Sequence, residues 1–321
     1  MYIVSHRRLF FTVTGIILAI AIGSIAIFGL PLSIDFTGGS LVEVQYKDAR
    51  PALDTLSENV KQLALGEVSL RESGNNGVIL RSRTLTPAEH EAVLSALGTE
   101  VASTTATSSA PAIAPASFTE LRFNSIGPAL GSELATKTLY ALIAVIVAIM
   151  FYIAWAFRRV SRPVSSWTYG LIVVVILFHD VIVPAGFYAL LCHFTGVQVD
   201  SLFAVALLAI LGYSVNDTIV IFDRVREHLH TNEERKLVEP FEETVGKSVT
   251  ETLGRSINTS LTVALALLAL VFVGSKETVD FALVLLAGVI AGTYSSILLA
   301  APLLVPLAQR FAKTGSGKKK K

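Results

Sequence analysis

The chain has 321 residues, of which 52% are hydrophobic and only 16% are charged. A soluble protein of this length carries more charge, so the composition indicates a polytopic membrane protein. The net charge of +1 gives no indication of a nucleic-acid partner, and the single cysteine, Cys192, excludes an internal disulfide. No cluster of Cys and His has the spacing of a metal site.

Six apolar runs approach or exceed the roughly 20 residues that a membrane-spanning helix needs. The first is too long for the apolar region of a signal peptide and lacks a small-residue cleavage site after it, so it predicts a retained span. The fifth is short and is expected to extend back towards Gly254. The six runs are Leu9–Leu30, Thr138–Phe157, Trp167–Leu191, Leu202–Phe222, Ile257–Val273 and Phe281–Leu307.

Lys and Arg predict the orientation, because short cytoplasmic loops are enriched in them. They cluster before the first span, in alternate loops and after the last span, which places both termini in the cytoplasm. The basic tail is interpreted as a solvated flank, with attraction to anionic lipid as the alternative. The predicted organisation is a cytoplasmic N-terminus with the first span at 1–30, an external domain at 31–137, spans two to six at 138–309 with a cytoplasmic loop at 223–254, and a cytoplasmic tail at 310–321.

The external segment has the pattern of a small α+β domain. Alternating apolar residues predict strands, helical spacing predicts two helices, and Gly74–Gly77 predicts a hairpin turn. Thr86 and Glu89 form a capping box with Pro87 at the first helical position. A Ser/Thr/Ala/Pro tract at 101–117 predicts a flexible loop. The predicted elements are strands at 40–46, 68–73, 78–82 and 118–123, and helices beginning at 53 and 87, in the ferredoxin-like order βαββαβ.

That fold serves many functions, so it selects none of them. The segment shows no nucleophile with a nearby base, and Gly38-Gly39 is too short to cradle a phosphate. An interaction surface is therefore favoured over an enzyme for this domain.

Asp217 is the only charged residue in the fourth apolar run. It lies six residues before Asp223, about 9 Å inside the membrane edge if Asp223 marks that edge. Charges inside spans are unfavourable and usually face a bundle interior or a water path. Asn216 and Thr218 supply an amide and a hydroxyl beside it. A proton carrier is favoured, and a permanently protonated carboxyl that binds a neighbouring helix is the alternative.

Two more charges lie in or beside the spans. Arg255 begins the fifth span, where it either pairs with Asp217 and keeps it ionised or extends its side chain to the cytoplasmic surface. Asp180 lies near the middle of the third span and is either a second relay group or a structural hydrogen-bond partner. His179 precedes it, but neighbouring residues point to different helix faces, so no His–Asp couple is expected.

Small residues predict close helix approaches in the membrane. Gly212 and Ser214 keep the fourth span slim beside Asp217, and Gly288 with Gly292 forms a weak GxxxG signal in the sixth.

Several of these stretches together resemble one family. The motif Ile34–Gly39 follows the first span, Ile126-Gly127-Pro128 precedes the second, His179-Asp180 lies in the third, and GYSVNDTIVIFDRVRE (212–227) ends the fourth. The chain resembles the SecD/SecF family of Sec protein-export accessory subunits, within the resistance–nodulation–division superfamily. Six spans with one small external domain resemble the SecF branch. The motif positions are Asp35, Gly38, Gly39, Gly212, Asp223 and Arg224.

The resemblance implies a function and partners. It implies pairing with SecD, action beside the SecYEG channel in the bacterial inner membrane, and use of the proton motive force to help move a translocating polypeptide. The family's proton-pathway aspartate corresponds to Asp217 and its arginine to Arg255. No cofactor is implied, and coupling to Na⁺ instead of H⁺ stays open.

Two other function classes stay open. One is a related proton-driven exporter of lipids or small molecules, for which the small external domain leaves little room. The other is a structural scaffold of the translocon without ion coupling. An enzyme is not expected, because no nucleophile motif, phosphate loop or metal-ligand set is present in the sequence.

Overall fold

The computed structural model describes residues 2–98, 117–158 and 164–317, with the side chains of 276–277 and 310–317 outside that description. The predicted loop at 101–117 therefore lies outside the described residues except for Ser117. The chain divides into two compact units. One comprises 1–31 with 138–321, and the other comprises 32–137.

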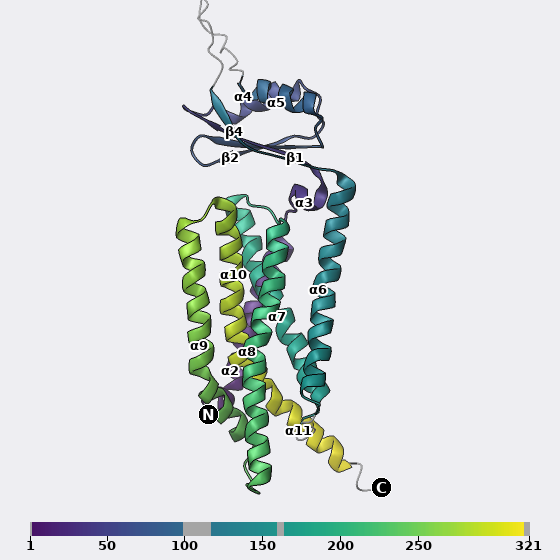
Figure 1. Ribbon diagram of the computed structural model, residues 1–321, viewed down its shortest axis with the longest axis vertical. Coiled ribbons are helices and arrows are strands. Elements are labelled where there is room, and N and C mark those ends of the chain that lie inside the picture. Colours follow the sequence, from purple (N-terminus) through teal and green to yellow (C-terminus); the bar gives the residue numbers. More distant parts are fainter. Residues whose placement is uncertain (1, 99–116, 159–163, 318–321) are drawn as a thin grey trace, which may run out of the picture. The chain divides into compact units, whose positions relative to one another are not determined.

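The 32–137 unit, which the sequence predicts to be external and which we call the external unit, has the predicted βαββαβ order (Figure 1). Its sheet has the strand order β2-β3-β1-β4, and each neighbouring pair is antiparallel. A one-turn helix, α3, precedes the first strand and was not predicted. The elements are α3 (Ile34–Thr37), β1 (Gly39–Tyr46), α4 (Leu53–Lys61), β2 (Ser69–Ser73), β3 (Gly77–Ser82), α5 (Pro87–Gly98) and β4 (Phe118–Ile126).

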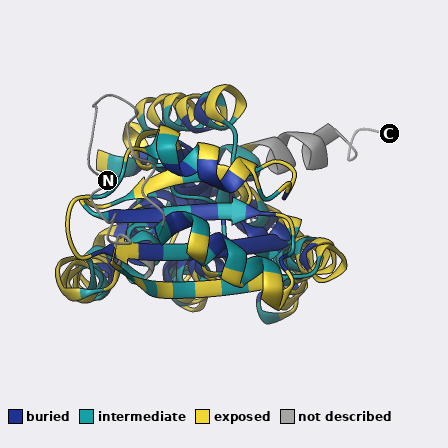
Figure 2. Cartoon of the chain, turned by 90° about the horizontal axis from the view of Figure 1, so that it is seen from above, coloured by how far each residue is buried: buried dark blue, intermediate teal, exposed yellow. Residues whose placement is uncertain are grey.

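The core of this unit lies between the sheet and its two helices. Val42 and Val44 of β1 alternate towards Leu56 of α4 and Leu97 of α5, and all four side chains are fully buried. In Figure 2 the buried residues concentrate in the central strands, and the outer helix surfaces are mostly exposed. The apolar alternation of the sequence thus sets which face of the sheet is covered.

The second unit is a bundle of long helices. Within the described residues, six candidate spans are long and apolar enough to cross a membrane, which agrees with the predicted number. The last span is interrupted by a π-helical turn, η1. The helices are α1 (Tyr2–Ser5), α2 (Arg7–Phe28), α6 (Pro128–Ala156), α7 (Ser166–Thr195), α8 (Ser201–Glu234), α9 (Phe241–Val273), α10 (Lys276–Ser295), η1 (Ser296–Ala300) and α11 (Ala301–Gly317).

The segment at 223–254, predicted as a cytoplasmic connection with helical character, is helical over most of its length. Helix α8 continues to Glu234 and α9 starts at Phe241, so only 235–240 are non-helical. Lys247 and Thr244 of α9 donate to Glu239 in this turn, and Asn232 of α8 donates to the same carboxylate, which ties the two helix ends together. Most charged residues of the segment lie on helix surfaces beyond the apolar segments.

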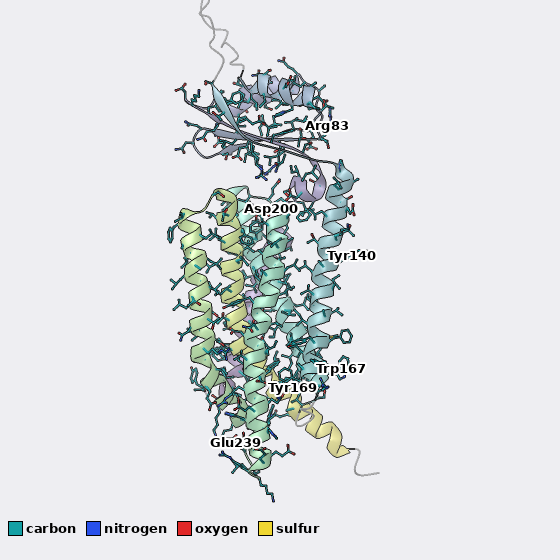
Figure 3. The ribbon with its side chains drawn as sticks, viewed as in Figure 1. Arg83, Tyr140, Trp167, Tyr169, Asp200 and Glu239 are labelled. Carbon is teal, nitrogen blue, oxygen red and sulfur yellow. The ribbon has the colours of Figure 1, made fainter. Side chains whose placement is uncertain are left out.

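The helices differ in how far they are enclosed. About half of the spanning window of α7 and of α8 is buried, against 11% for α6 and α9. Tyr140 and Trp167 lie on the outer surface of the bundle (Figure 3). Buried polar residues of the bundle come from α7, α8, α9 and the sixth span, among them Asp180, Asp217, Ser256 and Ser296. We call the end of the bundle where α8 ends and α9 begins the base.

Candidate functional site

A polar cluster lies inside the bundle where α7 meets α8. Asp180 of α7 is fully buried and accepts a hydrogen bond from the hydroxyl of Ser214 on α8. A buried carboxyl requires such partners, because an unsatisfied polar group in a low-dielectric interior is strongly unfavourable. Within the described residues Asp180 thus joins two helices, which agrees with its structural interpretation and leaves a relay role untested.

The expectation of no His–Asp couple in the third span is wrong. His179 Nδ1 lies 2.8 Å from Asp180 Oδ1, and both side chains are buried. Adjacent residues are about 100° apart around a helix, and the short aspartate side chain can still turn back to its neighbour. The His179 ring also stacks on Tyr294, with ring centroids 6.2 Å apart, and its buried Nε2 atom has no hydrogen-bond partner in the part of the chain that the structure describes.

The cluster continues from α8 to the π-helical turn. The hydroxyls of Thr218 and Ser296 form a hydrogen bond of 2.8 Å in which either can be the donor, and the hydroxyl that keeps its proton free can donate to the Ser214 carbonyl at 3.3 Å. A π-helical turn interrupts the regular hydrogen-bond pattern of an α-helix and is frequent at functional sites. Thr218, predicted as a partner of Asp217, therefore binds the sixth span, and Ser296 provides the contact.

Asp217 lies one turn from Ser214 towards the base. Its side chain is buried, and its Oδ2 atom has no hydrogen-bond partner among the described residues. The Ser256 hydroxyl of α9 lies beside it without a well-formed hydrogen bond, and Arg255 acts on the carboxyl through its charge alone. The structure thus brings Asp217 and Arg255 near one another and shows no direct ion pair between them in the part of the chain it describes.

Two predicted neighbours of Asp217 point away from the bundle. Asn216 and Gly212 are exposed, and a Cβ built on Gly212 would meet nothing within 4 Å. Gly212 does not serve a close helix contact within this unit. Arg255 and Asn258 of α9 are exposed as well, so α8 and α9 carry polar groups on the outside at the depth of a membrane span.

The close helix contact is made by Gly288 and Gly292. A Cβ on Gly288 would lie 2.2 Å from Ile210 Cδ1, and one on Gly292 would lie 3.0 Å from Ser214 Cβ. The weak GxxxG signal therefore marks a real approach between the sixth span and α8. It holds Ser214 in position to reach Asp180.

The two glycine motifs of the external unit pack on one another. Gly38 has φ +75°, and a Cβ there would lie 2.5 Å from Pro128 Cα, while one on Gly131 would lie 2.6 Å from the Gly38 nitrogen. Gly39 has φ +123°, and its Cβ would meet the Ser82 carbonyl. Glycine is needed at these positions because a side chain would clash with backbone. Asp35 lies next to them in α3, whose first turn Ser33 caps.

Charged residues of the fourth-span motif form ion pairs near the base. Arg224 binds Glu227 at 2.6 Å and Glu251 of α9 at 2.5 Å, and Asp223 pairs with Arg226 at 3.4 Å. They are part of a helix pair rather than of a loop.

Sequence reasoning missed several members of the site. Ser214 was noted only for its small size, while Ser256, Ser296 and Tyr294 were not singled out. Hydroxyl residues are common in spans, and their ability to bond their own helix carbonyls leaves no pattern that marks a partner on another helix.

Two family comparisons match the chain. The family described as "Protein export membrane protein SecD/SecF, C-terminal" matches residues 106–310, and the "SecD/SecF GG Motif" matches residues 23–49.

Curated relatives cover most of the chain. A protein named "Protein translocase subunit SecF" from Anaerolinea thermophila is 37% identical over 305 residues, covering 94% of this chain and 92% of the relative. The protein of the same name from Thermobaculum terrenum is 37% identical over 318 residues, covering 94% and 92%.

Solved structures also match. The crystal structure of SecDF from Thermus thermophilus, which is described as a translocon-associated membrane protein, has a TM-score of 0.76 at 30% identity. The match covers 96% of this chain but only 39% of that longer one. A second SecDF structure, in its super-membrane-facing form, has a TM-score of 0.64 at 28% identity and covers 97% of this chain.

Proposed function

This chain belongs to the SecD/SecF family of protein export membrane proteins and has an accessory role in Sec protein export, and we propose that it acts there with SecD, beside the SecYEG channel, as a proton-driven and non-enzymatic subunit. The proposal places it in the bacterial inner membrane with both termini cytoplasmic. The base of the bundle is then the cytoplasmic end, and the 32–137 unit lies outside. The Lys and Arg pattern supports that orientation.

Pairing with SecD is supported by the exposed polar groups of α8 and α9. Asn216, Arg255 and Asn258 are exposed in the single chain, and such groups facing hydrocarbon would lose the hydrogen bonds that water or protein provides. A second bundle against this face would cover them. The 39% share of the solved SecDF chain that this chain spans leaves ample length there for further helices.

Proton coupling is supported chiefly by one observation, the buried Asp217 carboxyl with an oxygen that has no hydrogen-bond partner. A carboxyl in this state can gain or lose a proton when Arg255 approaches or withdraws. One charge that crosses a 100 mV potential is worth about 2.3 kcal/mol, which is enough to bias two helix arrangements. We propose that protonation weakens the attraction between Asp217 and Arg255 and that the bundle then shifts and moves the external unit.

The decisive test is export into inverted membrane vesicles that contain the channel, SecD and this subunit. Proton or sodium gradients are imposed on vesicles with the wild type, with Asp217→Asn, or with the exposed control Asp54→Asn on α4. Asp217→Asn is expected to remove stimulation by the proton gradient while the complex still assembles. The control should behave as the wild type.

Other outcomes would support other functions. Normal stimulation in Asp217→Asn, together with loss of export when the subunit is deleted, would support a structural scaffold. Stimulation by a sodium gradient alone would identify Na⁺ as the coupled ion. Transport of labelled lipid in the same vesicles without an effect on polypeptide export would support a lipid exporter.

A further inference from the structure

A pocket of about 550 Å³ lies between α8 and α9 on the base side of Asp217. Arg255, which directly precedes Ser256 beside Asp217, lines one part of the pocket, and Arg224 with Glu251 lines another. Along α9, Glu251 lies four residues before Arg255, which is about one helical turn closer to the base. The pocket therefore extends from the neighbourhood of Asp217 towards the end of the bundle.

The walls of this pocket are mostly charged. Five of its lining residues are ionisable, from both helices, and this density of charge is incompatible with a dry apolar space. The structure arranges these side chains around a shared space. Water is the occupant that this lining favours. The charged lining residues are Asp223, Arg224, Glu227, Glu251 and Arg255.

A histidine lies beside the pocket at the level of Glu251. His228 Nε2 is 3.1 Å from Glu251 Oε2, and Arg224 Nε donates to the same oxygen at 2.5 Å. The charged groups that reach His228 are therefore Glu251 from α9 and, through that carboxylate, Arg224 from α8. In the neutral imidazole, Nε2–H donates to the carboxylate, so Nδ1 carries the free lone pair.

These features have a chemical consequence. Histidine is the side chain whose ordinary pKa lies closest to neutral pH. The side chain of His228 is 18% exposed, so water can reach it, and its Nε2 atom lies 3.1 Å from the Glu251 carboxylate. Glu251 fixes the tautomer and the ring orientation, while Arg224 fixes Glu251.

We propose that this pocket is the water-filled vestibule through which protons pass between Asp217 and the cytoplasm, and that His228, positioned by Glu251, is the proton acceptor at its mouth. The inference rests on the proposed function and adds the exit route to it. The Asp217 carboxyl gives up its proton to vestibule water and becomes a carboxylate. His228 Nδ1 takes up one proton to form the imidazolium and then releases it from Nδ1 to cytoplasmic water, which restores the neutral ring.

The water content of the pocket is tested by thiol labelling. In a Cys192→Ser background, Val220→Cys places a thiol in the pocket and Leu265→Cys places one on the exposed apolar face of α9. Inverted vesicles with the assembled complex are treated with a charged, membrane-impermeant thiol reagent. At least tenfold faster labelling at 220 than at 265 is expected. Equal labelling rates at positions 220 and 265 would overturn the proposal that the pocket is a water-filled vestibule.

The role of His228 is tested by the pH profile of gradient-driven export, measured by varying the pH on the cytoplasmic face. His228→Gln is expected to flatten the profile between about pH 6 and 8, the range in which a histidine titrates. Glu251→Gln should weaken the same pH response, because the imidazole ring loses the carboxylate that orients it. His230→Gln, on an exposed ring paired with Glu234, is the matched control and should keep the wild-type profile.

The outcomes separate the two proposals. A wild-type profile in His228→Gln overturns the acceptor role even where 220 is labelled rapidly. Full stimulation in Asp217→Asn overturns proton coupling itself, whereas the labelling result does not depend on transport. Loss of stimulation in Asp217→Asn at every pH, with rapid labelling at 220 and a flat His228→Gln profile, supports both.

Discussion

The two units of this chain place their polar groups in opposite ways. In the external unit the sheet and helices enclose apolar side chains, and the ion pairs lie at the surface, such as Arg83 with Glu89. In the bundle, Asp180, Ser214 and Asp217 are buried while large apolar and aromatic side chains are exposed. Water solvates the surface of the first unit and lipid much of the surface of the second, so buried carboxyl groups occur in the bundle, whereas the carboxyl groups of the first unit pair at its surface.

This difference also affects what a polar residue signifies. A surface ion pair in the external unit adds little to stability, because water competes for both partners. A buried carboxyl in the bundle must be hydrogen-bonded, be protonated or take part in function. The same residue type is therefore strong evidence for function only in the second unit.

The largest effect on stability is expected at the contact between α2 and α7 in the bundle. A Cβ on Gly186 would lie 2.5 Å from Ala21 Cα, so Gly186→Ala must push the backbones apart and is expected to destabilise the bundle by about 3 kcal/mol. Gly23→Ala on α2 meets nothing within 4 Å and should be neutral or slightly stabilising. Thermal unfolding of the purified subunit in detergent compares them. Equal midpoints would show that the bundle does not depend on this small-residue contact.

Removing an interior hydroxyl should have the next largest effect. Ser214→Ala takes the hydroxyl donor away from the buried Asp180 carboxyl, for a loss of about 1–3 kcal/mol. Thr12→Ala removes an exposed hydroxyl that bonds its own helix at Arg8 and should change the unfolding midpoint little. If both variants have the same unfolding midpoint, the interior hydrogen bonds of the bundle contribute less to its stability than their burial indicates.

The helix cap of the external unit should matter less. Thr86 and Glu89 exchange hydrogen bonds at 2.8 and 3.3 Å at the start of α5. Thr86→Ala should lower the stability of this helix by about 1 kcal/mol. Amide hydrogen exchange of α5 in the intact chain measures the change, with the exposed substitution Glu91→Gln as the control. A loss as large as that from Ser214→Ala would remove the contrast between the units.

The smallest effect is expected in the turn between α8 and α9. Hydrogen bonds from Lys247, and then from Asn232, lower the pKa of Glu239 from 4.5 to about 2. Since the folded-state pKa is depressed, the stabilisation is complete above about pH 4.5 and is lost as the pH falls towards 2.

Glu239→Gln should therefore lower the unfolding midpoint slightly at pH 7 and not at all near pH 2, with an energy of about 1 kcal/mol or less. The exposed variant Glu233→Gln is the control. A difference that persists undiminished at pH 2 would assign the effect to packing instead of charge.

A site residue can be predicted from the sequence when it is unusual in its own segment, without knowledge of its spatial neighbours. Asp217 stands out because it is the single charge in an apolar run, and no neighbour is needed to notice it. His179 with Asp180 was judged from helix geometry alone and was judged wrongly, since side-chain rotation decides whether adjacent residues meet. The link from Asp180 through Ser214 to Ser296 joins three segments of the chain, and hydroxyl residues give no periodic signal of such partners.

By itself the sequence determined the number of spans, the βαββαβ order of the external unit and the position of the buried aspartate, because hydrophobic periodicity and the energy of a charge in a span are local properties. Only the tertiary structure decided that Gly38 packs on Pro128 and that Ser214 rather than Gly212 faces the neighbouring helix. These features depend on which surfaces meet across large separations in the chain. No window of residues contains that information, since the free energy of each contact belongs to both of its partners.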